Sequence, residues 1–138
     1  MVNRSLFNKN STAIGKLAEK DAQHFLEQHG LTLLEKNFIT YNSNGKKTGE
    51  IDLIMQDGLC LVFTEVKARS NTAYGNTLET ISKQKQNRLI QAATQYLIQK
   101  NMYNSAYCRF DVIGIAWNQQ NIQTEQIMWI KNAFEVQY

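Results

Sequence analysis

The chain has 138 residues, of which 43% are hydrophobic and 20% are charged, and its formal net charge at pH 7 is +3. This length and composition predict a single domain over residues 1–138 and exclude a disordered or collagen-like protein. No apolar run approaches the roughly 18 residues that a membrane span requires, and the N-terminus lacks the apolar block of a secretory signal. We therefore expect a cytoplasmic protein without a membrane partner, whose first ~10 residues are flexible.

The first predicted helix begins at Ser11 or Thr12 and ends near His29, with Gly30 as its C-terminal stop. Glu19 lies at the edge of its apolar stripe. That stripe has a period near 3.6 and consists of Ile14, Leu17, Ala18, Ala22, Phe25 and Leu26.

Three strands are predicted next. The apolar run Leu31–Ile39 predicts the first strand, and Asn42–Thr48 is expected to be a polar loop. Two further strands, Gly49–Gln56 and Leu59–Arg69, flank Asp57-Gly58. An Asp-Gly pair between alternating apolar residues strongly indicates a hairpin turn.

The second half of the chain is predicted to contain a mobile polar loop, a helix, a strand, a turn and a last strand. These are residues 70–79, a helix from Thr80 or Ser82 to about Lys100, the strand Tyr107–Trp117, the turn Asn118–Asn121 and a strand near Ile127–Lys131. Together the elements predict an α/β fold, with a central mixed β-sheet flanked by helices: a core in α-β-β-β-α-β order, followed by the last strand.

The charge is distributed unevenly along the chain. Residues 66–110 contain seven Lys and Arg residues against Glu79 alone, a net charge of +6. A basic segment of this kind is typical of proteins that bind a polyanion, although a solvated helix face has the same composition. Cys60 and Cys108 are too few for a disulfide scaffold and are expected to be reduced thiols. The chain has no CxxC, HExxH, Walker A or GxGxxG motif, which removes the usual support for zinc, P-loop and dinucleotide sites.

The predicted hairpin brings acidic side chains together. With Asp57-Gly58 as a two-residue turn, Asp52 would face Phe63, and Asp52 and Glu65 would be diagonal neighbours about 7–8 Å apart at the backbone. Alternation then gives one charged face, with Glu50, Asp52, Glu65 and Lys67. The opposite face would be the core side, with Ile51, Leu53, Met55, Cys60, Val62 and Val66.

Carboxylates gathered on one patch repel each other unless a cation lies between them. Hard oxygen ligands suit Mg²⁺ or Mn²⁺, which neutralise charge on a phosphoryl group and lower the pKa of a bound water. Lys67 could orient the attacking water or stabilise charge in the transition state. The alternative is an ordinary exposed strand face, on which Lys67 pairs with Glu65 or Glu50.

Other charged residues leave two interpretations open. Glu19 could reach the patch as a third acid or be a solvated helix residue. Lys85 follows the apolar stripe of the second helix and could lie beside the acids or simply extend its amine to solvent. Asp111 is expected to be a structural partner of Arg109 rather than a fourth acid. The two histidines, His24 and His29, are expected on the surface and not as ligands.

The order of these residues resembles the PD-(D/E)XK nuclease superfamily of restriction-endonuclease-like folds, in which an acid such as Asp52 is followed across a hairpin by a motif such as Glu65-Val66-Lys67. A wider set of motifs is similar to the small bacterial YraN family. It comprises Gly15-x3-Glu19-x2-Ala22, Gly49-Glu50-Ile51-Asp52-Leu53-Ile54, Phe63 to Arg69, Lys85 before Ala92-Ala93 and Tyr96-Leu97, Arg109-Phe110-Asp111-Val112, and Asn132-Ala133-Phe134.

The resemblance implies a Mg²⁺-dependent core similar to archaeal Holliday-junction resolvases. Asp52 and Glu65 would be metal ligands, Glu19 would act on a water held by the metal, and Lys67 would be the catalytic lysine. Lys85 matches an accessory basic position on the second helix. The proline that names the superfamily motif is absent, because Ile51 precedes Asp52.

These observations predict a Mg²⁺-dependent (or Mn²⁺-dependent) endonuclease-like hydrolase that cleaves phosphodiester bonds of DNA, including branched or structured DNA. DNA is favoured over RNA, and a two-fold homodimer would suit a junction substrate. The basic side chains predicted to contact nucleic acid are Arg69, Lys83, Lys85 and Arg88. The alternatives are a non-catalytic nucleic-acid-binding module that keeps the nuclease fold and a sheet-edge interaction protein.

Overall fold

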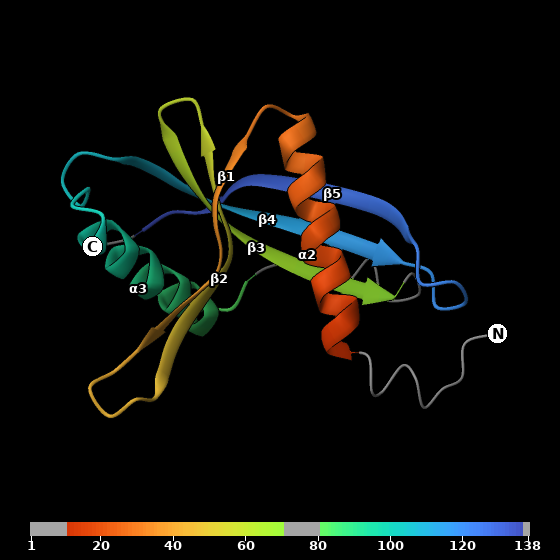
Figure 1. Ribbon diagram of the computed structural model, residues 1–138, viewed down its shortest axis with the longest axis horizontal. Coiled ribbons are helices and arrows are strands. Elements are labelled where there is room, and N and C mark those ends of the chain that lie inside the picture. The colour runs from red at the N-terminus through yellow and green to blue at the C-terminus, as the bar shows by residue number, and fades with distance from the viewer. Residues whose placement is uncertain (1–10, 71–80, 137–138) are drawn as a thin grey trace.

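The computed structural model describes residues 11–70 and 81–136 and has the predicted α/β architecture (Figure 1). The elements in chain order are helix α2 (Ser11–Gln28), strands β1 (Thr32–Tyr41), β2 (Lys47–Asp57) and β3 (Cys60–Ser70), helix α3 (Lys83–Gln99), and strands β4 (Tyr107–Trp117) and β5 (Thr124–Phe134). The predictions for the first ten residues and for residues 71–79 of the polar loop fall outside the described residues.

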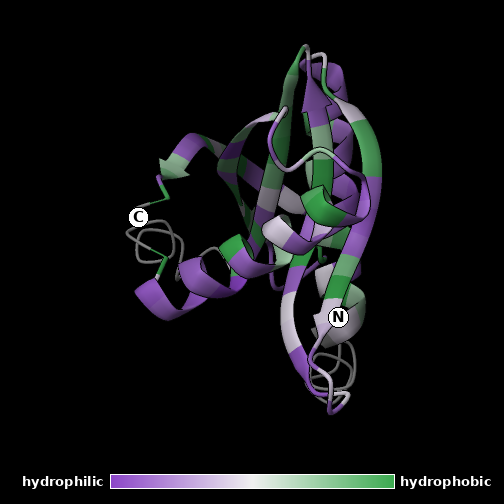
Figure 2. Cartoon of the chain, turned by 90° about the vertical axis from the view of Figure 1, so that its left-hand side faces the viewer, coloured by the Kyte–Doolittle hydropathy of each residue, from purple (hydrophilic) through white to green (hydrophobic). Residues whose placement is uncertain are grey.

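The sheet is mixed, and its spatial order β1-β2-β3-β4-β5 follows the chain. β3 and β4 are parallel and are connected through α3, whereas the other neighbouring strands are antiparallel. The two helices pack on opposite faces of the sheet (Figure 1), and each covers a cluster of buried apolar residues. Hydrophobic residues recur along the strands (Figure 2). The expectation of a single core side is therefore wrong, because α3 covers the face that carries Ile54 and Phe63.

The helix ends follow the local signals in the sequence. Gly30 has φ 91°, and the N–H of Leu31 donates to the Leu26 carbonyl at 3.1 Å, which ends α2 as predicted. Of the two predicted starts for α3, the structure uses Ser82, whose Oγ accepts from the Lys85 N–H at 3.1 Å. α3 then begins with its basic residues at the end nearest β3.

The register of the β2–β3 hairpin differs from the prediction by two residues. Ile54 pairs with Phe63, and Asp57 pairs with Cys60, so the turn is Gly58-Leu59. Gly58 accepts φ 59° at the first turn position, and Leu59 is 86% exposed. A shift of two residues leaves each side chain on its predicted face. Continued by one step, the register places Asp52 opposite Glu65 rather than diagonal to it.

β2 bends at Asp52. Ile51 packs in the cluster under α3, whereas Leu53 and Met55 pack in the cluster under α2. Regular alternation would place all three on one face, so the predicted common face is wrong at Ile51. Beyond this point the β1–β2 hairpin leaves β3 and projects as an arm (Figure 1). A fork between β2 and β3 therefore begins at Asp52.

The arm is held against α3 at Gly49. A Cβ atom on this glycine would lie 2.6 Å from the Arg88 carbonyl oxygen and 3.2 Å from the Ala92 Cβ. Only a residue without a side chain allows this approach of backbone to backbone. Gly49 thus sets the distance between α3 and the fork.

Candidate metal and nucleic-acid site

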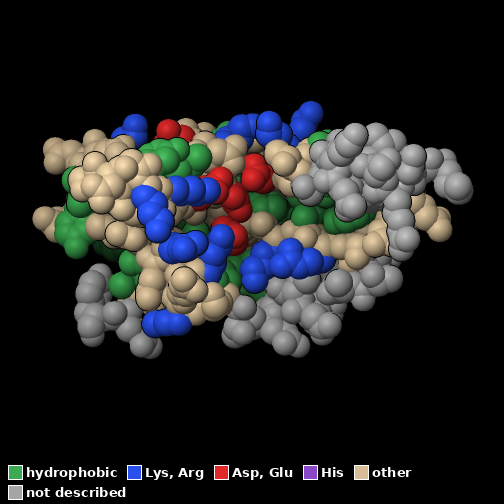
Figure 3. Space-filling model, turned by 90° about the horizontal axis from the view of Figure 1, so that it is seen from below, with side chains coloured by type: hydrophobic (Ala, Val, Ile, Leu, Met, Phe, Trp, Pro, Cys, Tyr) green, Lys and Arg blue, Asp and Glu red, His purple; other side chains and the backbone are tan. Residues whose placement is uncertain are grey.

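The two carboxylates predicted as metal ligands lie at the fork. Asp52 comes from β2 and Glu65 from β3, and Glu65 is only 8% exposed. The Val66 N–H donates to Asp52 Oδ2 at 2.8 Å, so the carboxylate of β2 takes a position that a strand carbonyl would otherwise occupy. Figure 3 shows acidic side chains gathered in the middle of one face, with Lys and Arg side chains around them.

Burial makes the ionised form of Asp52 unfavourable. Burial, and next the charge of Glu65, raise its pKa from the ordinary 3.8 to about 8, although the Val66 hydrogen bond acts in the opposite direction. Two acids that share a poorly solvated site have a strong affinity for a proton or another cation.

Lys85 provides a cation at this place. Its Nζ lies 3.1 Å from Glu65 Oε1, and its side chain is 45% exposed. The Ser82 cap and the Gly49 contact position the first turn of α3 so that Lys85 reaches across to β3. Lys85 therefore contacts the acid cluster in this structure, and its predicted contact with phosphate stays a prediction.

Glu19 approaches the same cluster from α2. It is half-buried, and burial is the main cause of its raised pKa. The charges of Glu50 and Glu65 act in the same direction, while a hydrogen bond from Asn37 and the charge of Lys36 act in the opposite one. The structure thus brings the predicted third acid into the field of the carboxylate pair.

Asn37 was missed by sequence reasoning. It lies within an apolar run that predicts a strand, and its one distinguishing signal is that asparagine is uncommon in strand interiors.

The other predicted basic residues lie on β3 and α3, the elements that supply Glu65 and Lys85. Lys67 follows Glu65 by two residues on β3, is half-buried and pairs with Gly114 of β4. Arg69 is exposed, and its Nη1 donates to the Ala68 carbonyl. Lys83 and Arg88 are exposed on α3. These side chains are accessible to a large anionic ligand.

Asp111 is a structural residue, as predicted. It is 1% exposed and accepts from Arg109 Nε at 3.0 Å, from Trp129 Nε1 at 2.9 Å and from the Asn132 N–H at 2.9 Å. These bonds hold an irregular pairing of β5 on β4 between Phe110 and Val112, and β5 extends further than the sequence indicated. His24 of α2 and His29, which follows the end of α2, are exposed, also as predicted.

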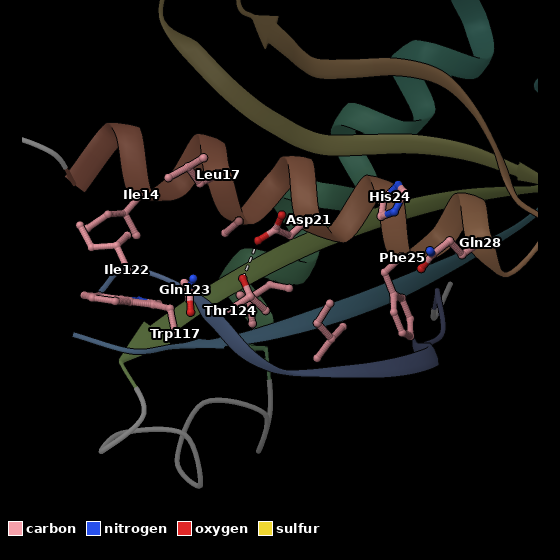
Figure 4. Close-up of a pocket in the computed structure, with 13 residues that line it drawn as sticks. Ile14, Leu17, Asp21, His24, Phe25, Gln28, Trp117, Ile122, Gln123 and Thr124 are labelled. Atoms are coloured by element: carbon pink, nitrogen blue, oxygen red, sulfur yellow. Dashed lines mark hydrogen bonds between the residues drawn. The ribbon is translucent and has the colours of Figure 1, made fainter. Parts of the chain in front are cut away.

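A mainly apolar pocket lies away from the fork. It has a volume of about 490 Å³, lies between α2, β4 and β5 and includes Leu17, Phe25 and Trp117 (Figure 4). Across it, Thr124 Oγ1 donates to Asp21 Oδ2, which ties α2 to β5 two residues after Glu19. No predicted site residue lines this pocket.

Within residues 11–70 and 81–136, no three His, Cys, Asp or Glu side chains converge closely enough to hold an ion by themselves. Asp52 and Glu65 would therefore supply two donors to a cation and leave the remaining positions to water or substrate, as is usual for Mg²⁺. No helix in the described part of the chain has the length and apolar character that crossing a membrane requires.

Comparisons with known proteins identify relatives over most of the chain. The model of the uncharacterised protein family UPF0102 matches residues 18–115, a stretch that contains every predicted site residue. A UPF0102 protein of Coxiella burnetii is 42% identical over 125 residues, which cover 91% of this chain and 94% of the relative. A UPF0102 protein of Colwellia psychrerythraea is 40% identical over 92% of this chain and 92% of the relative. One of Pseudomonas fluorescens is 39% identical over 88% of this chain and 92% of the relative.

Proposed function

The chain belongs to the uncharacterised protein family UPF0102, the YraN family, and from its site we propose that it is a metal-dependent nuclease that hydrolyses phosphodiester bonds of DNA. The observation that carries this proposal is the poorly solvated pair Asp52 and Glu65 at the fork, in contact with Lys85 and surrounded by exposed basic side chains. The basic side chains of such a surface attract a polyanion, and the acids at its centre would then lie against the bound polyanion.

The donor set fits Mg²⁺ or Mn²⁺. Asp52 and Glu65 offer hard oxygen atoms, and burial together with the charge of Glu65 keeps the pKa of Asp52 high. When bound there, a divalent cation neutralises charge on the phosphoryl group and lowers the pKa of water. Asp52 and Glu65 would hold it.

The neighbouring residues have roles that follow from their charge and position. Glu19 would take a proton from the attacking water, and its raised pKa brings its proton affinity closer to that of a working general base. Lys67 would orient the water or stabilise the additional negative charge on the phosphate in the transition state. Lys85, Lys83, Arg88 and Arg69 would contact backbone phosphates, which position a nucleic acid without specifying its sequence.

The test is a cleavage assay on a four-way junction, a linear duplex and a single strand, each with Mg²⁺ and with a chelator. We expect cleavage that requires the cation and is lost in Asp52→Asn, Glu65→Gln and Lys67→Met. Calorimetric titration with Mn²⁺ should show binding that disappears in Asp52→Asn and Glu65→Gln and persists in Lys67→Met.

The outcomes separate the proposal from its alternative. DNA binding without cleavage, unaffected by Mg²⁺ and by Lys67→Met, would replace the nuclease with a non-catalytic nucleic-acid-binding module. If the wild type binds neither DNA nor Mn²⁺, both the nuclease and the non-catalytic binding module are refuted.

A further inference from the structure

Asn37 has an unusual backbone conformation for a strand residue. It lies inside β1 with φ 53°, in the left-handed region. A residue with a Cβ atom adopts this conformation at a cost, and asparagine is among the residues that tolerate it best. Non-glycine residues of this kind occur preferentially where a site requires a particular backbone path.

The conformation coincides with the bend at Asp52. The β1–β2 register passes from Lys36↔Leu53 to Phe38↔Ile51, with no pair at Asn37 and Asp52 between them. On the other side of β2, the pairing with β3 ends at Leu53. The left-handed residue therefore stands directly across from the point where β2 changes face and Asp52 turns toward Val66.

The side chain of Asn37 reaches the other helix. Asn37 lines one hollow together with Glu19 of α2 and with Lys36, and there its amide lowers the pKa of the Glu19 carboxyl, as a donor to the charged form does. Glu19 is otherwise surrounded by the charges of Glu50 and Glu65 on one side and of Lys36 on the other, and burial disfavours its ionised form. A neutral amide donor at this place orients the Glu19 carboxylate and leaves its negative charge in place, whereas a lysine would neutralise that charge.

We infer that Asn37 is a positioning residue, which uses its left-handed backbone to open the strand at Asp52 and its side-chain amide to hold Glu19 toward the Asp52–Glu65 pair. The inference deepens the proposed nuclease function and rests on it for the catalytic effect. The contact itself, however, can be tested without any substrate. Asn37 acts through Glu19 and does not touch substrate.

The chain offers a matched control. Asn132 of β5 is also left-handed inside a strand, at φ 52°, but its contact with Asp111 is made through the backbone N–H. Glycine accepts the left-handed conformation at both positions and keeps the backbone donor. Asn37→Gly therefore removes the amide that orients Glu19, whereas Asn132→Gly keeps the bond to Asp111.

The experiment measures the carboxyl titration of Glu19 by NMR, together with kcat and KM for the best DNA substrate. We expect Asn37→Gly to raise the pKa of Glu19, because a donor to its charged form is lost. We expect kcat to fall about tenfold or more, since a displaced general base loses orientation, with KM changed less than about twofold. Asn132→Gly should leave the titration and kcat unchanged.

Two further outcomes keep the test decisive. If Asn37→Gly does not fold, Asn37→Asp preserves size and backbone tolerance but replaces the donor with a charge, and should raise the Glu19 pKa further. An unchanged Glu19 titration in both variants would overturn the inference. If the wild type cleaves no DNA but the Glu19 titration responds to Asn37→Gly, the proposed function fails while the contact stands.

Discussion

Asp52→Asn should make the protein more stable, by an amount that grows with pH. The folded-state pKa of Asp52 is about 8, against an ordinary 3.8. The folded protein therefore holds more protons than the unfolded chain between these values, and its stability falls as pH rises through the window from about 4 to about 8. At about 1.4 kcal/mol for each pKa unit, keeping Asp52 protonated in the folded protein while it ionises in the unfolded chain costs about 2 kcal/mol of stability at pH 5 and about 4 kcal/mol at pH 7.

Asparagine removes this charge while keeping the shape of the side chain and an oxygen that can accept the Val66 N–H. We expect Asp52→Asn to be more stable than the wild type by up to about 4 kcal/mol at pH 7 and by up to about 2 kcal/mol at pH 5. The free energy of unfolding in urea, measured at pH 5, 6, 7 and 8, tests both the sign and the slope.

Glu27→Gln, at an exposed carboxylate of α2, is the control and should leave the pH dependence unchanged. Equal stability of Asp52→Asn and the wild type at every pH, or a less stable variant at pH 7, would refute the reasoning. Repeating the titration with Mn²⁺ at about 100 times its Kd should stabilise the wild type by about 2.7 kcal/mol and Asp52→Asn by much less. Asp52 would then lower the stability of the cation-free protein and be required for cation binding.

Three further substitutions test the surroundings of the site. Lys85→Met removes the cation that contacts the buried Glu65 carboxylate and should tighten Mn²⁺ binding about two- to fivefold in calorimetry. The control Lys83→Met should leave Mn²⁺ binding unchanged, and weaker binding in Lys85→Met would contradict the reasoning. Gly49→Ala places a Cβ atom 2.6 Å from the Arg88 carbonyl oxygen and should lower the free energy of unfolding in urea by about 1–3 kcal/mol. In the control Gly15→Ala, nothing lies within 4 Å of the new atom, and the free energy of unfolding should rise by up to about 1 kcal/mol. Arg88→Ala should lower the slope of log affinity for DNA against log salt concentration by about one, and an unchanged slope would remove Arg88 from the nucleic-acid surface.

Much of the fold could be predicted because it depends on neighbours along the chain. The 3.6-residue stripe and Gly30 defined α2, the serine cap defined the start of α3, and β4 runs over Tyr107–Trp117 as predicted. Strand alternation also predicted that Asp52 and Glu65 lie close together, and the charge of Glu65 does act on Asp52 in the structure although the predicted turn was wrong.

The sequence by itself thus determined the elements, their order and the acids at one patch of sheet, since periodicity, caps and turn residues act over a few positions. Only the tertiary structure decided the register of the hairpin, the bend at Asp52 and the approach of Lys85 and Asn37 to the acids. These features depend on how α3 packs on Gly49 and how β1 bends beside β2, which are contacts between residues far apart in the chain. Such contacts are selected by the packing of the whole core, and the residues that make them carry only a weak local signal.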